Sequence, residues 1–270
     1  MQLPVQNGTL TLSDHTVDYI RFGRGKQKMI LLPGLGDGLG SVKGTALPMA
    51  LGYRSWGKDF TVYSLSRRNA LPQGFTTKDM AADVAAAMAA LGMEKAHVLG
   101  VSMGGMIAQH LAADFPERVE KLALAVTCPG PNAILKESIE EWVALAKAGD
   151  TTGFMKSNLR RIYSEGYCKK NLWLTPIIGR LTKPKSYERF FIQAEACLTH
   201  DARAGLGCIS APTLVIGGER DLALGVEGSK ALAAAIPGAR LHIYPQWGHG
   251  CYEEAEDFNG LVKAVFLDQA

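Results

Sequence analysis

The stretch from Ala96 to Phe115, AHVLGVSMGGMIAQHLAADF, decides the fold. Its first part, 97–101, is a short apolar run that predicts a buried strand, and 106–115 predicts a helix. Between them, Gly100-Val-Ser-Met-Gly104 fits the pattern G-x-S-x-G. In a strand–turn–helix setting this pattern is typical of a nucleophile elbow, which displays a reactive serine on a sharp turn. The alternative interpretation is an ordinary glycine-rich turn.

The chain on either side of this turn alternates between predicted strands and helices. A hairpin is expected over 5–12 and 17–22, an Ala-rich helix begins at Thr76/Thr77, and further strands are expected at 29–32, 60–65, 121–127, 212–216 and 240–244. Helices are expected over 228–236 and 253–267. This alternation predicts an α/β fold with a mostly parallel central sheet flanked by helices.

The alternation stops between residues 128 and 205. This segment predicts only helical pieces, at 139–148, 154–162 and 186–198, and no strand. We therefore expect a core made of residues 1–127 and 206–270, interrupted by a helical insertion over 128–205.

Composition excludes several classes of protein. Of the 270 residues 47% are apolar and 20% charged, which excludes a disordered or fibrous chain, and the net charge of +3 is too balanced for a dedicated nucleic-acid binder. No apolar run reaches the roughly 20 residues of a membrane span, and the N-terminal sequence lacks the pattern of a signal peptide. The five cysteines form no C-x-x-C pair or metal-ligand spacing. We expect a cytoplasmic enzyme with free thiols and neither a metal nor an organic cofactor.

A serine hydroxyl needs a base to become a nucleophile. Of the six histidines, His249 lies in the loop QWGHG, after the last predicted strand and before the last helix. In a parallel sheet this loop lies at the carboxyl edge, where Ser102 is also displayed. His249 is therefore the candidate base, and a surface loop histidine is the alternative.

The base in turn needs an acid that orients it. The loop Gly217-Gly-Glu-Arg-Asp221 follows the neighbouring predicted strand and offers Asp221, with Glu219 as its rival. The other suitable position follows Thr127 and holds Cys-Pro-Gly, with no carboxylate. Asp221 is the candidate acid, and an ordinary turn aspartate is the alternative.

The order Ser102, Asp221, His249 along the chain is that of α/β-hydrolases. The sequence resembles that superfamily through LLPGLGD, GVSMGGMIAQHLAADFPERV, APTLVIGGERD and WGHGCYEEAEDF. Within it, the elbow and the following helix resemble the 3-oxoadipate enol-lactonase and small-carboxylesterase group. The resemblance implies that the insertion is a cap over the active site. It also implies an oxyanion hole, which we assign to the backbone N–H groups of Leu35 and Met103.

Two stretches of the chain depart from the family pattern. Pro33-Gly34 stands where relatives often have His-Gly, and Ser66 and Asn69 stand where they commonly have Asp and Gly. Gly34 is expected to lie against the substrate. Trp142 and Trp173, from the insertion, are expected to line an acyl pocket or, alternatively, to form the core of the cap.

These residues predict a carboxylic ester hydrolase of the 3.1.1 class, which cleaves a small-molecule ester or lactone through an acyl-enzyme. A carbon–carbon bond hydrolase, an acyltransferase or perhydrolase, and a ligand receptor with vestigial hydrolysis stay open, as does the oligomeric state. The insertion carries 12 Lys/Arg against 8 Asp/Glu. We read this excess as a solvated face, with the steering of anionic substrates as the alternative.

Overall fold

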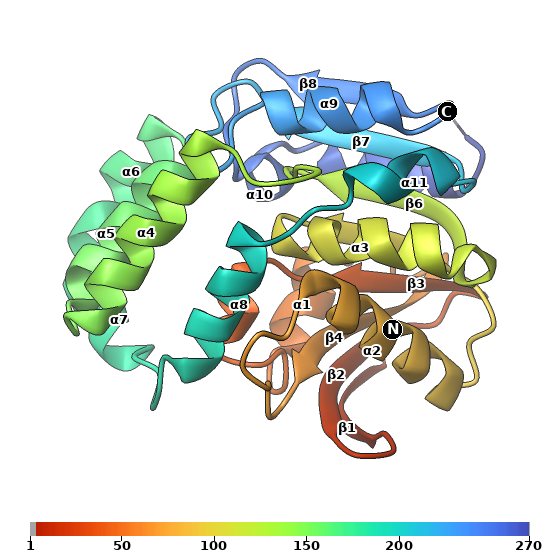
Figure 1. The fold of residues 1–270 in the computed structure, drawn as a ribbon, viewed down its shortest axis with the longest axis horizontal. Helices are drawn as coiled ribbons and strands as arrows, with labels where there is room; N and C mark the ends of the chain where they lie inside the picture. Colours follow the sequence, from red (N-terminus) through yellow and green to blue (C-terminus); the bar gives the residue numbers. More distant parts are fainter. Residues whose placement is uncertain (1–3, 270) are drawn as a thin grey trace.

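A single mixed sheet forms the centre of the computed structural model, which describes residues 4–269 (Figure 1). Within these residues the sheet has eight strands in the order β1-β2-β4-β3-β5-β6-β7-β8. Strand β2 is antiparallel to β1 and β4, and every later pairing is parallel. The strands are β1 (Val5–Thr11), β2 (Thr16–Gly23), β3 (Gln27–Leu32), β4 (Phe60–Arg68), β5 (Ala96–Val101), β6 (Val119–Ala125), β7 (Thr213–Gly218) and β8 (Arg240–Tyr244). The predicted α/β class is confirmed.

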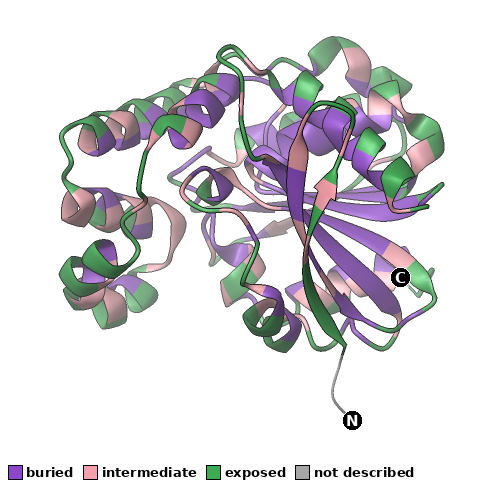
Figure 2. Ribbon diagram, turned by 90° about the horizontal axis from the view of Figure 1, so that it is seen from below, coloured by how far each residue is buried: buried purple, intermediate pink, exposed green. Residues whose placement is uncertain are grey.

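Helices cover both faces of the sheet, and the apolar strand residues lie between them (Figure 2). One core cluster joins the sheet to α2 (Thr77–Ala90), α3 (Met103–Asp114) and α9 (Glu227–Ala235). The other joins it to α1 (Ala46–Gly52) and α11 (Phe258–Phe266). The central strands β5, β6 and β7 are almost wholly buried, as their continuous apolar runs predict.

Local sequence signals explain how α2 begins. Thr76 accepts a hydrogen bond from the N–H of Asp79, and the Asp79 side chain accepts one from the N–H of Thr76, which forms a capping box. Beyond the helix, Gly92 adopts a φ of +65°, a conformation that glycine tolerates best. The start agrees with the expectation that this helix begins at Thr76/Thr77.

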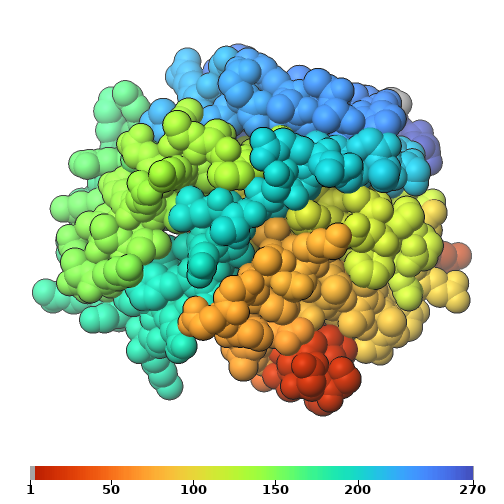
Figure 3. Space-filling view, in the orientation of Figure 1, coloured from red at the N-terminus to blue at the C-terminus, as the bar shows by residue number. Residues whose placement is uncertain are grey.

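The insertion leaves the sheet after β6 and returns before β7. It consists of α4 (Ala133–Lys147), α5 (Thr151–Ile162), α6 (Glu165–Asn171), α7 (Thr175–Leu181) and α8 (Glu188–Leu198), with a short 3-10 turn, η3, at Leu172–Leu174. Its two ends meet where the N–H of Ala202 donates to the carbonyl of Pro129 at 2.9 Å. In Figures 1 and 3 the insertion, green to teal, forms the side of the molecule beside the carboxyl edge of the sheet.

Several elements differ from the expectations. Helices α1, α6 and α7 were not expected, since each has only seven residues and too little sequence to show a periodicity. The single helix expected over 253–267 is instead α10 (Cys251–Glu254) followed by α11, because Ala255 is buried in an extended conformation between them. None of the described helices is long and apolar enough to cross a membrane.

Candidate active site

Ser102 stands at the turn between β5 and α3. Its backbone adopts φ 55° and ψ −121°, a strained conformation for a residue with a side chain. The strain is held by hydrogen bonds on both sides. The N–H of Ser102 donates to the carbonyl of Ala125 on β6 at 2.9 Å, and the Ser102 carbonyl accepts from the N–H groups of Gly105 and Met106. The turn therefore displays the hydroxyl at the carboxyl edge of the sheet, as an elbow does.

The glycines around Ser102 are required by close packing. A Cβ atom on Gly104 would lie 2.0 Å from the carbonyl oxygen of Leu32, and one on Gly100 would lie 2.5 Å from the carbonyl oxygen of Gly104. Both obstacles are backbone atoms, which cannot turn aside as a flexible side chain can. The glycines of G-x-S-x-G are therefore needed because the turn brings backbone atoms too close for a Cβ.

The structure brings His249 and Asp221 together. Nδ1 of His249 lies 2.8 Å from Oδ2 of Asp221, and both side chains are buried. The other carboxylate oxygen, Oδ1, accepts from the N–H groups of Ala223 and Leu224, each at 2.8 Å. Burial opposes ionisation of Asp221, but the charge and hydrogen bond of His249 and the two N–H donors outweigh it and lower the pKa of Asp221. The rival Glu219 lies near Lys230 on the outside of the fold.

The loops that carry these two residues are fixed to each other. The N–H of Arg220 donates to the carbonyl of Trp247 at 3.1 Å. A Cβ on Gly218 would lie 2.2 Å from the carbonyl oxygen of Gly248, so glycine at this position permits the close contact. On its other side, the His249 loop is bound to the insertion, because the N–H of Gly250 donates to the carbonyl of Ile162 at 2.6 Å.

The loop after β3 lies directly beside Ser102. A Cβ on Gly34 would lie 3.3 Å from the Ser102 Cβ and 3.8 Å from its Oγ. Leu35 begins a short 3-10 helix, η1 (Leu35–Gly38), and Met103 is the first residue of α3. The N–H groups at the start of a helix have no partner within that helix, so these two residues can offer donors to an anionic oxygen.

A cavity of about 290 Å³ lies between this loop, the insertion and Ser102. Both Ser102 and His249 line it, together with Gly34 and Leu35. The insertion contributes apolar and aromatic side chains and one amide: Trp142, Phe154, Asn158, Ile162, Tyr163 and Phe190. Among the described residues that line the cavity there is no lysine and no arginine.

The two tryptophans expected to line the pocket differ in position. Trp142 lines the cavity and is buried, and its indole Nε1 has no hydrogen-bond partner among the described residues. Trp173 is 69% exposed and its Nε1 donates to the carbonyl of Lys170, so the expectation that it lines the pocket is corrected. The sequence around Trp173 did not indicate which way its side chain points, because the 3-10 turn η3 that carries it was not predicted.

A buried ion pair beneath the Gly34 loop was not predicted from the sequence. The carboxylate of Asp37 is fully buried and accepts from Nη2 of Arg189 at 2.5 Å and from Oγ of Ser66 at 2.5 Å. Arg189 also donates to the backbone carbonyls of Arg67 and Arg68 at the end of β4. The unusual Ser66 thus helps to hold the loop, and α8 of the insertion is tied to it. Asp37 is a single aspartate in a glycine-rich loop, and nothing in the sequence around it indicates that Arg189 is its partner.

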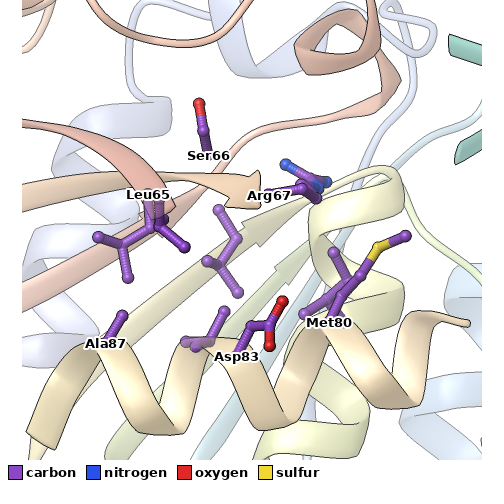
Figure 4. Close-up of a pocket in the computed structure, with 10 residues that line it drawn as sticks. Leu65, Ser66, Arg67, Met80, Asp83 and Ala87 are labelled. Carbon is purple, nitrogen blue, oxygen red and sulfur yellow. The ribbon is translucent and has the colours of Figure 1, made fainter. Parts of the chain in front are cut away.

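A smaller cavity lies between β4 and α2, with Leu65, Ser66 and Arg67 on one side and Met80, Asp83 and Ala87 on the other (Figure 4). Its volume of about 10 Å³ is close to that needed by one water molecule. Arg67 extends one guanidinium N–H from this region to the carbonyl of Pro33 at 2.6 Å, which gives the Gly34 loop a second support. Elsewhere in the described chain, no group of three or more His, Cys, Asp or Glu side chains could hold a metal ion.

Comparison with known proteins gives three findings. A family model described as the alpha/beta hydrolase fold matches residues 28–256. A 2-hydroxy-6-oxononadienedioate/2-hydroxy-6-oxononatrienedioate hydrolase of Klebsiella pneumoniae is 28% identical over 96% of this chain and 93% of its own. A 2-hydroxy-6-oxo-6-phenylhexa-2,4-dienoate hydrolase of Comamonas testosteroni is 28% identical over 93% of this chain and 91% of its own.

Among solved structures, the enol-lactonase from Burkholderia xenovorans superimposes with a TM-score of 0.80. It covers 96% of this chain and all of its own at 22% identity. At this level of identity the likeness shows the fold alone.

Proposed function

The chain belongs to the alpha/beta hydrolase fold family, and on that premise we propose that it is a serine hydrolase that cleaves a carboxylic ester or lactone of a small, uncharged molecule. The observation that carries the proposal is that Ser102, on its strained turn, lines the same cavity as His249. Nδ1 of His249 is hydrogen-bonded to Asp221, which leaves Nε2 for the reaction. Asp221 then fixes the imidazole so that Nε2 can accept a proton.

In the proposed reaction, Nε2 of His249 takes the proton of the Ser102 hydroxyl while Oγ attacks the ester carbonyl. The N–H groups of Leu35 and Met103 donate to the oxygen that becomes negative. The carbonyl re-forms as the alcohol leaves with the proton from His249. Water, deprotonated by the same imidazole, then attacks the acyl-enzyme and releases the acid and Ser102.

The insertion is proposed to act as the cap of this site, with residues 1–127 and 206–270 as the catalytic core. It supplies the aromatic wall of the cavity through residues such as Phe154 and Phe190. It is attached on both sides, because Arg189 binds Asp37 and the Ser164 side chain donates to Glu254 at 2.6 Å. A cap held at both ends excludes water from the serine while a substrate occupies the cavity.

The lining of the cavity supports an uncharged substrate. Carboxylates are recognised by arginine or lysine side chains, and neither lines the cavity among the described residues. Among the described lining residues, Asp37 alone carries a carboxylate, and it is already paired with Arg189. The volume of about 290 Å³ lies at the lower end of the usual range of ligand pockets, roughly 300–1,000 Å³, so the substrate is small.

Carbon–carbon bond hydrolysis is the second candidate, because the two relatives above are named as hydrolases of dienoate and dienedioate compounds. The same serine, histidine and aspartate serve that reaction, with a carbon leaving group in place of an alcohol. The absence of a cation in the described lining weighs against an anionic substrate of this type. An acyltransferase or perhydrolase would form the same acyl-enzyme and pass it to an acceptor other than water, and a receptor would form it with little turnover.

A substrate panel tests the proposal. We expect kcat/KM for p-nitrophenyl butyrate and for a small neutral lactone to exceed that for a p-nitrophenyl ester bearing a free carboxylate by at least about tenfold. A preference for 2-hydroxy-6-oxo-6-phenylhexa-2,4-dienoate over every ester would replace the proposal with carbon–carbon hydrolysis. A single stoichiometric release of p-nitrophenol without turnover would replace it with a receptor.

A further inference from the structure

Helix α7 of the insertion presents an apolar face to the outside. Trp173, Ile177 and Leu181 are spaced four residues apart along the continuous helical backbone of η3 and α7, so they lie on one side. Their exposed fractions are 69%, 54% and 80%. We refer to these three residues as the outer stripe. A surface helix normally turns such residues inward, so this stripe needs an explanation.

The inward face of α7 is already occupied. Thr175 and Gly179 are buried, and a Cβ on Gly179 would lie 3.2 Å from the carbonyl oxygen of Thr151 on α5. Rotation of α7 about its axis therefore cannot bury the outer stripe against α5, because the residues that already face α5 are closely packed. In Figure 1, α7 lies at the end of the insertion farthest from the sheet, and in Figure 3 the same segment projects from the lower left of the molecule.

The sequence around the stripe is cationic. Residues 166–187, the basic segment, contain five lysines or arginines and no aspartate or glutamate. The five are exposed: Lys169, Lys170, Arg180, Lys183 and Lys185. Among the described ion pairs, only Lys169 has an acidic partner, the exposed Glu165. The cations lie outside the cavity that Ser102 lines, so they do not serve substrate binding there.

Exposed aromatic and aliphatic side chains beside unpaired lysines and arginines form the pattern by which a protein lies on an anionic lipid surface. The apolar stripe enters the boundary of the acyl chains, and the cations meet the headgroups. A second copy of this chain fits less well, because a two-fold contact through the stripe would bring two acid-free basic segments together. We propose that the outer stripe and the basic segment bind the surface of a membrane containing anionic lipid, independently of the proposed ester hydrolysis.

Vesicle co-sedimentation of the full chain tests this proposal. The probes are vesicles of phosphatidylcholine alone and vesicles in which about a third of the lipid is phosphatidylserine. We expect binding to the second kind, and a decline in binding as salt is added, since the headgroup attraction is screened. Lipids brominated in the acyl chain should quench part of the tryptophan fluorescence, and Trp173→Phe should abolish that quenching.

Matched variants separate the two parts of the surface. Lys183→Gln with Lys185→Gln should weaken binding to the anionic vesicles by about 25-fold, at about fivefold for each cation. Lys26→Gln with Lys58→Gln, a pair of exposed lysines on the core, should leave binding unchanged. Leu181→Ser should also weaken binding, whereas Leu51→Ser, 64% exposed on α1, should not.

Thermal unfolding midpoints equal to that of the parent protein will show that these surface variants are folded. The proposal is overturned if the parent chain sediments with neither kind of vesicle, or if the core lysine pair weakens binding as much as the Lys183/Lys185 pair. It is also overturned if Leu181→Ser converts a dimer into a monomer, since the stripe would then be covered by a second copy.

Discussion

Arg189 on α8 donates from Nη2 to Oδ2 of Asp37 at 2.5 Å, and this ion pair joins the insertion to the loop beside Ser102. The Asp37 side chain is completely buried. Removing one partner from a buried ion pair leaves the other charge without compensation, which makes such a pair sensitive to substitution. The pair thus links the stability of the fold to the position of the Leu35 N–H group.

Replacement of Arg189 by Met should therefore lower the free energy of unfolding by about 3–5 kcal/mol and reduce kcat/KM for a neutral ester. Urea unfolding and steady-state kinetics measure the two effects. The control is Arg203→Met, which breaks an exposed pair with Asp201 and should leave the free energy of unfolding nearly unchanged. Equal losses for the two variants would contradict the account of the buried pair.

Gly104→Ala should destabilise the protein by about 3 kcal/mol or more, or prevent folding, because the new Cβ would meet the carbonyl oxygen of Leu32 at 2.0 Å. Gly260→Ala is the matched control. Gly260 is exposed on α11 with open space around it, so alanine should stabilise the helix by about 0.5–1 kcal/mol. Opposite signs in urea unfolding are expected, and a Gly104→Ala protein of full stability would refute the packing argument.

Trp142→Phe keeps the apolar surface of the cavity and removes only the indole N–H, which has no partner among the described residues. If this donor binds a substrate oxygen, KM for an ester with an acceptor atom in its acyl part should rise about 3- to 10-fold. KM for a purely aliphatic acyl ester should change little. Trp173→Phe, outside the cavity, should alter neither value, and an equal change for both esters would mean that the N–H does not contact the substrate.

Acid should weaken the fold through His200, whose ring lies buried with Nδ1 2.9 Å from the Thr77 hydroxyl. Burial lowers the pKa of His200 to about 3. At pH values between about 6.5, the ordinary pKa of histidine, and the lowered pKa of His200, the unfolded chain binds a proton that the folded chain does not. In this pH window the free energy of unfolding therefore decreases as the pH is lowered, by up to about 1.4 kcal/mol per pH unit from this group.

The measurement is urea unfolding of the parent and of His200→Asn at several pH values between about 6.5 and 4. The variant loses one hydrogen bond and can start from a lower stability, so the slopes are compared rather than the absolute values. A shallower slope is expected for the variant. Identical slopes would show that His200 does not contribute to the acid sensitivity.

The sequence predicted those features that local rules determine. The elbow at Ser102 follows from glycines at fixed spacing, and the start of α2 was expected from the capping threonines Thr76/Thr77. The contact between Asp221 and His249 could be expected because the carboxyl ends of parallel strands meet at one edge. Their catalytic roles stay predictions.

Features that depend on distant parts of the chain could not be predicted in this way. Asp37 and Arg189 are separated by 152 positions, and neither residue carries a local signal of the other. The direction of Trp173 depends on how α7 packs on α5, which composition does not reveal. For the same reason the cationic excess of the insertion could be counted but not placed inside or outside the cavity.

Activity of Ser102→Ala tests the central claim most directly. We predict that kcat/KM for p-nitrophenyl butyrate falls by at least about 10⁴-fold, with an unchanged thermal unfolding midpoint, and that a fluorophosphonate probe labels the parent but not the variant. Ser186→Ala, at an exposed position of the insertion, should retain full activity and labelling. A folded Ser102→Ala protein that keeps activity within about tenfold of the parent would contradict the assignment of Ser102 as the nucleophile.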